Sequence, residues 1–395
     1  MNPIVIPTRE LELEPHRVFK TYRPLTPFIK RDDGVYIAIR AGDVESLATD
    51  PRTRQLQTEL GLSRGVTQGP LFDFFNNSML LSNGIAHRRR RAPLSRAFAL
   101  RVINDLRPHI RKIVNTLIDE HYARGEMSFR DEFAAWVPAR VIADILGIPT
   151  ADIPEFTRNV YQLARSLTPT FSRADVPELD DAADRLTKYV EMLLDERRRE
   201  PRDDLLTAYL HAADEADLLS RIEALIQIVT VLLAGSDTTR AALTIQASLL
   251  LQNREQWDAL CHDSSLISGA VLESLRYEPS VGSFPRFTLE DIEIDGRTVP
   301  SNRMLSMSTL SALRDPALYR DPDRFDITRT DHPRRPMVFG AGSHRCLGET
   351  LALLELEETL AALAERLPKL ELVCNAPSIE GSGGIRRVGE MQVRW

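Results

Sequence analysis

The chain contains few cysteines. Its 395 residues include three, Cys261, Cys346 and Cys374, an odd number scattered along the sequence. This number and spacing exclude a disulfide framework and are typical of a reducing compartment. We therefore expect a cytoplasmic protein in which at least one cysteine is free for chemistry.

Long hydrophobic runs are also missing. Two of the longest uncharged stretches, 224–236 and 241–253, have 13 residues each, whereas a membrane span takes about 20 apolar residues. The first twenty residues carry Arg9, Glu10 and further charges with no apolar run between them. We therefore expect no secretory signal and no contact with a membrane.

Positive charge is not in excess. The chain has 50 basic and 57 acidic residues and a net charge of −7, so as a whole it repels nucleic acid, and we expect no nucleic-acid partner. Against this background stands one basic run, a histidine followed by four arginines at 87–91. We interpret it as a helix face that meets an acidic partner or ligand.

What the sequence does contain is typical of a folded domain. Hydrophobic residues make up 43% and charged residues 27%, and no Gly/Ser-rich or Pro-rich linker divides the chain, so we expect one domain over residues 1–395, as a monomer. Apolar residues recur at helical spacing, which predicts a mainly α fold with helices at 105–124, 132–147, 178–198, 219–252 and 348–367. Strand patterns with turns occupy 24–39, 283–308 (turn at 295–296) and 370–395 (turn at 380–384).

Cys346 has the surroundings of a metal ligand. A cysteine taken alone is more often a small buried hydrophobe, but here Gly340 and Gly342 precede it and a helix is predicted to follow. Glycines permit a tight loop whose N–H groups can point at sulfur. The helix N-terminus, with the adjacent His344 and Arg345, favours the metal-binding thiolate. These features, with room for a flat ligand at Gly348, predict a thiolate ligand to haem iron.

This segment resembles the haem-binding loop of the cytochrome P-450 superfamily. The family pattern F-x-x-G-x-x-x-C-x-G is matched at Phe339, Gly342, Cys346 and Gly348. The resemblance implies the cytochrome P-450 fold, a helical haem-enclosing domain with small β-sheets at one side. It also implies heme b (iron protoporphyrin IX) as cofactor, with Cys346 as the metal ligand and Phe339, Gly340 and Gly348 beside the haem.

Two weaker motifs extend the resemblance. Glu273 and Arg276 match the family's E-x-x-R, and their spacing puts both on one helix face. The segment 322–325 matches P-x-R-F, whose arginine, here Arg324, is expected to be the third member of the ion cluster. Such a buried cluster would lock the helix to the loop that carries Cys346.

The longest predicted helix carries a segment, 234–239, that resembles the family's A-G-x-D-T-T. We expect Gly235 and the hydroxyl-rich run to weaken the helix locally, so that a displaced carbonyl leaves a groove for O2. Asp237 and Thr238 are then the catalytic acid and alcohol that relay protons, with Ala234 beside the haem. The alternative is a polar kink with no ligand.

Four basic residues match the family's contacts to the haem propionates. His87 and Arg91 correspond to H-x-x-x-R, and Arg286 and His344 to the contacts with the other propionate. The alternative is that each is a surface cation. The arginines between the first pair have no role in the pattern, and we expect Arg88, Arg89 and Arg90 to dock an acidic electron donor.

The resemblance implies a bacterial haem-thiolate monooxygenase that inserts one oxygen atom from O2 into a small, apolar substrate. No flavin or iron–sulfur module lies in the chain, so electrons would come from NAD(P)H through ferredoxin reductase and ferredoxin. The alternatives are a peroxide-driven oxygenase and a non-enzymatic haem sensor or carrier. Around the substrate we expect Thr230, Leu233, Ala234, residues 281–284 and the 380–384 turn, with Phe72, Phe74 and Phe75 as a roof, at least one of which packs in the core instead.

Overall fold

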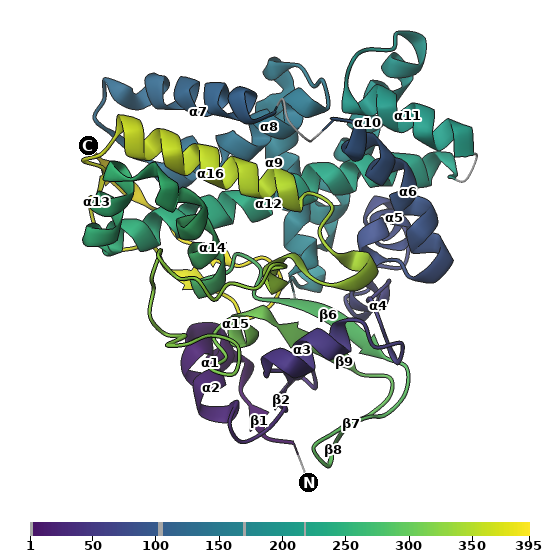
Figure 1. Cartoon of the computed structure of the whole chain (residues 1–395). Coiled ribbons are helices and arrows are strands. Elements are labelled where there is room, and N and C mark those ends of the chain that lie inside the picture. Colours follow the sequence, from purple (N-terminus) through teal and green to yellow (C-terminus); the bar gives the residue numbers. More distant parts are fainter. Residues whose placement is uncertain (1–2, 102–105, 169–170, 217–218) are drawn as a thin grey trace.

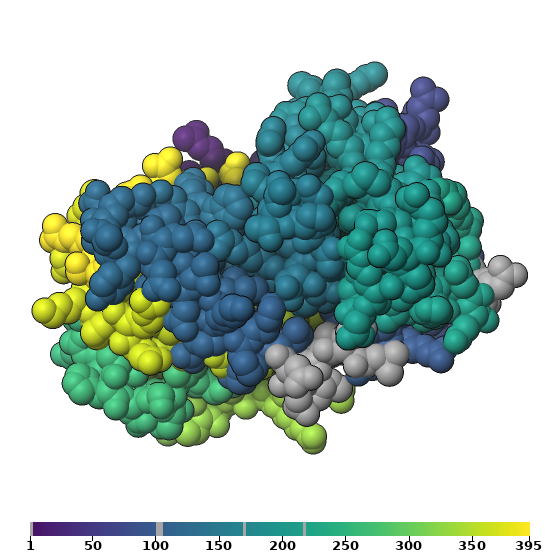
Figure 2. Space-filling view, turned by 90° about the horizontal axis from the view of Figure 1, so that it is seen from above, coloured from purple at the N-terminus to yellow at the C-terminus, as the bar shows by residue number. Residues whose placement is uncertain are grey.

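The computed structural model describes residues 3–101, 106–168, 171–216 and 219–395. Helices make up most of the molecule, and the strands labelled in Figure 1 lie at the side where the N-terminus lies. The helices of residues 106–168 and 171–216, α7 to α11, cover much of the face seen in Figure 2. This arrangement confirms the predicted helical fold with small sheets at one side.

The described residues contain sixteen α-helices. They are α1 Thr8–Leu13, α2 Pro15–Tyr22, α3 Ala41–Ala48, α4 Glu59–Ser63, α5 Pro70–Asn77, α6 Gly84–Arg101, α7 Leu106–Tyr122, α8 Trp136–Ile145, α9 Ile153–Ala164, α10 Val176–Arg199, α11 Leu205–Ala216, α12 Arg221–Gln252, α13 Arg254–His262, α14 Ile267–Tyr277, α15 Thr309–Ala312 and α16 Glu349–Arg366. The five predicted helices correspond to α7, α8, α10, α12 and α16, although residue 105, the predicted start of the first, lies outside the described residues.

The strands form one six-stranded sheet and three smaller ones. The large sheet has the order β1-β2-β3-β9-β6-β4 and the others pair β10-β13-β5, β11-β12 and β7-β8. Their bounds are β1 Val5–Ile6, β2 Phe28–Arg31, β3 Tyr36–Ala38, β4 Thr53–Arg54, β5 Glu126–Ser128, β6 Ser283–Thr288, β7 Ile292–Ile294, β8 Arg297–Val299, β9 Met304–Ser308, β10 Glu371–Leu372, β11 Ile379–Glu380, β12 Arg387–Val388 and β13 Gln392–Arg394. The predicted hairpin across 380–384 is β11–β12, while β13 pairs instead with the distant β5.

Two turns with positive φ explain local sequence choices. Asp295 (φ 50°) and Gly296 (φ 68°) form the turn between β7 and β8, and a two-residue hairpin turn of this kind needs positive φ at both positions. Asn302 (φ 57°) lies in the turn that leads from β8 to β9. Asparagine tolerates the left-handed region better than most residues, so the turn is kept.

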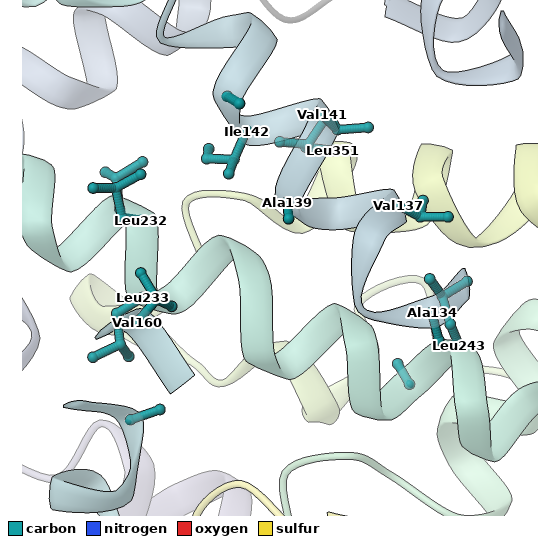
Figure 3. Close-up of a cluster of buried hydrophobic side chains, with 14 of the residues drawn as sticks. Ala134, Val137, Ala139, Val141, Ile142, Val160, Leu232, Leu233, Leu243 and Leu351 are labelled. Carbon is teal, nitrogen blue, oxygen red and sulfur yellow. The ribbon is translucent and has the colours of Figure 1, made fainter. Parts of the chain in front are cut away.

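Helix α12 is the central element of the core. Ser220 and Glu223 cap its first turn reciprocally, and the helix packs against α8, α9, α10 and α16. Ile142 of α8 and Ala134, which precedes α8, belong to the same buried cluster as Leu232, Leu233 and Leu243 of α12 (Figure 3). By length and composition α12 could cross a membrane, but 78% of its most apolar window is buried inside the fold. A core position accounts for its hydrophobicity.

A buried ion cluster ties α14 to the segment that leads to Cys346. Arg276 donates to both carboxylate oxygens of Glu273 at 2.7 and 2.8 Å, and to the carbonyl of Pro322 at 2.7 Å. The third member is Arg329, which donates to Glu273 at 3.1 Å. The expectation for Arg324 was wrong: its side chain is 72% exposed and only its carbonyl reaches Arg276.

Candidate functional site

One cavity brings together nearly all the predicted site residues. It has a volume of about 300 Å³ and lies between α12, α6, β6 and the loop before α16. Its wall includes Thr238 and every predicted cofactor contact, namely His87, Arg91, Ala234, Arg286, Phe339, Gly340, His344, Cys346 and Gly348. Asp237 is the predicted site residue that does not line it.

The loop around Cys346 is fixed by hydrogen bonds of its own backbone. The Cys346 N–H donates to the carbonyl of Phe339 at 2.8 Å, and Arg345 donates to the carbonyl of Gly340 at 2.9 Å and pairs with Glu349. Gly340 has a φ of 72°, in the region where side chains are strained. These bonds hold the cysteine at the cavity wall immediately before α16 begins.

The thiol of Cys346 is accessible from the cavity but lies deep in the molecule. Burial raises its pKa, against the lowering effect of the Gly348 N–H and of Arg91 and Arg345. The prediction that the residues around Cys346 favour its thiolate form is therefore wrong for the protein without a bound metal. Metal ions bind cysteine as thiolate, so binding here would release a proton.

Two histidines and two arginines also line the wall. The rings of His87 and His344 lie 4.0 Å apart. Burial and the neighbouring positive charges lower the pKa of His87 to about 4 and that of His344 to about 3. Both rings are therefore neutral at physiological pH and offer hydrogen bonds, while Arg91 and Arg286 supply the positive charge.

The two arginines are held by backbone carbonyls. Arg91 donates to the carbonyl of Arg345 at 2.7 Å, and Arg286 donates to the carbonyl of Ala48 at 3.0 Å and to the side chain of Gln55. Burial lowers the pKa of Arg286 to about 10, so it stays charged at neutral pH. Anchoring of this kind leaves each guanidinium with N–H groups that can meet an anion in the cavity.

The hydroxyl-rich segment of α12 does not open the helix. The α-helix is continuous from Arg221 to Gln252. The hydroxyls of Ser236 and Thr238 donate to the carbonyls of Leu232 and Ala234, each at 2.8 Å. The expected displaced carbonyl is absent from this described segment because each hydroxyl bonds four residues back without breaking the ladder.

Asp237 faces Arg240. Its carboxylate pairs with the Arg240 guanidinium at 2.5 Å, and that guanidinium lies 4.1 Å from the ring centre of Tyr161. On a helix, neighbouring residues point in different directions, so Thr238 faces the cavity while Asp237 does not.

The predictions for the substrate side were correct in part. Thr230, Ala234, Val281 and Phe284 line the cavity, whereas Leu233 and the 380–384 turn do not. The predicted loop with Phe72, Phe74 and Phe75 is helix α5, whose Phe74 and Phe75 are buried in the core, and none of the three lines the cavity. Met79 and Leu80, in the 3-10 turn that follows, form the wall instead.

Glu355 is a cavity residue that the sequence reasoning missed. It lies on α16, is 2% exposed, and its Oε2 has no hydrogen-bond partner among the described residues. Burial raises its pKa well above the ordinary value, with no compensating charge. A glutamate one turn after the buried Leu351 on the apolar helix face was the available signal.

The arginines between His87 and Arg91 do not form the expected free basic face. Arg89 and Arg90 both pair with Glu223, Arg90 at 2.9 Å, and Arg90 is 8% exposed. Of these three, Arg88 alone is exposed without an ion pair among the described residues. The helix turns two of the arginines toward the start of α12, which a run of identical residues does not reveal.

These residues fit a haem. One cysteine sulfur offers a single soft axial ligand, and two anchored arginines provide charge for two carboxylates. A Cβ added at Gly348, which lines the wall, would meet no atom within 4 Å, so this side of the loop is open to a flat ligand. No group of three metal-ligating side chains occurs in the described residues, and a metal carried by a cofactor would need from the protein only the one ligand that Cys346 offers.

Comparison with known proteins agrees with this chemistry. A family model described as Cytochrome P450 matches residues 153–368. A relative, "Cytochrome P450-pinF1, plant-inducible" from Rhizobium radiobacter, is 44% identical over 394 residues and covers 100% of this chain and 93% of its own. The mycinamicin IV hydroxylase/epoxidase of Micromonospora griseorubida is 35% identical, covering 78% of this chain and 77% of the relative.

Solved structures show the same fold. P450BioI in complex with hexadec-9Z-enoic acid ligated acyl carrier protein has a TM-score of 0.89 and 30% identity, covering 96% of this chain and 98% of that one. Myxobacterial CYP267B1 in complex with myristic acid has a TM-score of 0.88 and 32% identity, covering 98% and 97%. The thiol at the cavity wall, the helical fold and these likenesses agree, and the chain belongs to the cytochrome P450 family of haem-thiolate monooxygenases.

Proposed function

We propose that this enzyme inserts one oxygen atom from O2 into a small apolar organic molecule held in the cavity between α12 and the Cys346 loop. The observation that carries the proposal is the single cavity shared by Cys346, the arginines and the Thr238 segment. The haem, when bound, supplies the oxygen-activating chemistry. Cys346 would hold its iron, and Arg91 and Arg286, with the neutral His87 and His344, would hold its propionates.

The wall on the substrate side supports an apolar substrate. Met79, Leu80, Val231, Ala234, Val281 and Phe284 all present hydrocarbon surface. Arg286 and Arg91 are already engaged beside the cysteine loop. Two solved relatives contain fatty acyl ligands, so a hydrocarbon chain is a reasonable first class of substrate for this enzyme.

Thr238 and Asp237 are proposed to deliver protons. The Thr238 hydroxyl lies at the wall and donates to Ala234. The hydroxyl can turn to donate into the cavity, because the Ala234 carbonyl lies in a continuous helix and keeps its backbone hydrogen bond when the hydroxyl turns away. Asp237 takes part only if its carboxylate leaves Arg240, so its role is to carry protons from the Arg240 side toward Thr238.

Electrons would come from NAD(P)H through a ferredoxin reductase and a ferredoxin. An acidic donor would meet exposed arginines near the cysteine loop: Arg334 and Arg335, which precede it, and Arg88, one turn before Arg91. None of the three has an ion-pair partner among the residues described. We also propose that the chain works as one domain and as a monomer in the cytoplasm.

The test is turnover by the purified holoenzyme. Compounds are first screened for the haem absorbance shift that marks substrate entry, beginning with myristic acid. Binders are then incubated with ferredoxin, reductase, NADPH and isotopically labelled O2, and we expect one labelled oxygen atom in the product. Equal turnover with hydrogen peroxide alone would favour a peroxide-driven oxygenase. NADPH consumption without product from any binder would favour a non-enzymatic haem protein.

A further inference from the structure

The last two residues of α5 and the segment that joins α5 to α6, together residues 76–83, cross the substrate side of the cavity, and we name them the strap. Its Met79 and Leu80 form part of the cavity wall. After Asn77 the strap has little regular structure, a single 3-10 turn at Met79–Leu81. Side chains from other elements therefore determine where these two wall residues lie.

Gln227 of α12 makes the most extensive of these contacts. Its Oε1 accepts from the Met79 N–H at 2.7 Å, and its Nε2 donates to the carbonyl of Asn77 at 2.9 Å and to that of Glu223 at 2.6 Å. Gln227 is fully buried, and Met79 is 9% exposed. Both amide hydrogens and the amide oxygen are thus used, two of the three on the strap.

Two neighbours on the same face of α12 also hold the strap. Thr230 shares a hydrogen bond of 2.9 Å with Ser78. Glu223 pairs with Arg90, which in turn donates to the carbonyl of Asn76 at 2.9 Å. The spacing of 223, 227 and 230 is that of one helix face. Strap residues 76 to 79 are therefore each linked to α12 by hydrogen bonds, residue 76 through Arg90 and the others directly.

The far end of the strap is fastened as well. Asn83 donates to the carbonyl of Gln55 at 3.0 Å and accepts from its N–H at 2.8 Å. With both ends held, the wall residues Met79 and Leu80 have no freedom to slide along α12. Gln227 is the contact nearest to them, since it bonds the Met79 amide itself.

We propose that Gln227 is a positioning residue that determines substrate selectivity by fixing Met79 and Leu80 at the cavity wall. The inference rests on the proposed function, since it concerns the substrate side of that cavity. Without the glutamine amide, the Met79 N–H and the Asn77 carbonyl would be buried and unpaired. Because unpaired buried polar groups are unfavourable, the strap would shift to satisfy them and the wall would change shape.

The test compares Gln227→Met with wild type in the ferric holoenzyme. Methionine keeps the length and apolar packing of the side chain but makes no amide hydrogen bonds. The probes are 1-alkylimidazoles with butyl, hexyl, octyl and decyl chains, whose ring reports iron ligation in the haem spectrum while the chain probes the wall. In the variant, we expect the ratio between the Kd of the weakest-binding and the tightest-binding chain length to shrink ~5–10-fold. This is the size expected for one or two lost buried hydrogen bonds. Imidazole itself should bind both proteins equally well.

Hydrogen exchange measures the strap directly. In Gln227→Met the amides of residues 77–81 should exchange ~10-fold faster or more, because their side-chain anchor is gone. The matched control is Gln252→Met on the same helix, whose amide bonds only Ser248. Ser78→Ala, which removes the bond to Thr230, should act in the same direction with a smaller effect and serves if Gln227→Met does not fold.

Faster exchange with an unchanged chain-length profile would overturn the role in selectivity. Unchanged exchange in both variants would overturn the role of Gln227 in holding the strap. A wild-type protein whose spectrum does not respond to imidazole would count against the proposed haem function instead, and the exchange rates would still decide whether Gln227 holds the strap.

Discussion

Glu273 accepts a hydrogen bond from Arg329 at 3.1 Å, across 56 residues of sequence. Glu273 is fully buried and also binds Arg276, while the backbone N–H of Asp326 donates to it at 2.8 Å. This one carboxylate joins α14 to two points of the segment that leads to the cysteine loop. The cluster therefore links the helical core to the haem side of the molecule.

Arg329→Ala should destabilise the protein by about 3–5 kcal/mol, since it leaves part of a buried carboxylate charge uncompensated. Arg324→Ala should change the free energy of unfolding by less than about 0.5 kcal/mol, because that side chain is exposed. Urea unfolding of both holoenzyme variants measures the difference. Equal losses in the two would show that Arg324 belongs to the cluster after all.

Cys346→Ala should abolish stable haem binding, because it removes the axial ligand that the cavity offers. Haem retained per protein after gel filtration, read from absorbance, is the measurement. Cys374→Ala is the control, as that thiol is exposed and outside the cavity. Full haem occupancy in Cys346→Ala together with the wild-type spectrum would mean that another residue ligates the iron.

Thr238→Ala should retain haem but waste electrons as hydrogen peroxide, since the hydroxyl proposed to deliver protons is gone. Product formed per NADPH consumed, with peroxide measured alongside, should fall, because a positioned proton donor speeds a proton-transfer step by about 100-fold or more. Ser236→Ala is the matched control: its hydroxyl also bonds four residues back but does not line the cavity. Normal coupling in Thr238→Ala would refute the relay.

Glu355→Gln should stabilise the protein increasingly as pH rises. Burial raises the folded-state pKa of Glu355 above its ordinary value of 4.5. Above that value the unfolded chain loses this proton and the folded chain keeps it, so wild-type stability falls as pH rises, until the pH reaches the folded-state pKa. Glutamine cannot ionise in either state, so the variant escapes this loss.

Unfolding free energies of Glu355→Gln and wild type between about pH 5 and pH 8 give the comparison. Glu365→Gln, at an exposed glutamate on the same helix, should show no such growing difference. The infrared band of a protonated carboxylic acid should persist in wild type above the ordinary pKa of 4.5 and be missing in Glu355→Gln. A Glu355 that ionises at its ordinary pKa would contradict the prediction.

Arg88→Glu combined with Arg335→Glu should weaken binding of an acidic ferredoxin, because both side chains are exposed near the cysteine loop. We expect slower reduction of the haem, with a loss that shrinks at high salt as surface charges are screened. Arg158→Glu on α9 is the charge-matched control, since it is also exposed and α9 packs on α10 and α12. Equal reduction rates in all variants would place the donor elsewhere.

Much of this protein follows from its sequence. The helices were predicted because apolar spacing is a local property, visible within one or two turns. The cysteine loop could also be predicted, since Gly340, Gly342, Cys346 and Gly348 lie within ten residues, and the positive φ of Gly340 and Gly342 gives these two a local conformational reason. Their presence in one cavity with His87 and Arg286 agrees with the resemblance from which those two were chosen.

Tertiary structure alone decided which charged or polar group meets which. Arg324 and Arg329 both follow the cluster helix at similar distance, yet the chain path turns one outward and the other onto Glu273. Asp237 pairs with Arg240. Arg89 and Arg90, which were expected on the docking face, pair with Glu223 instead. Gln227 carries no sequence signal at all. Such pairings depend on the relative placement of elements far apart in the chain, which local spacing does not encode.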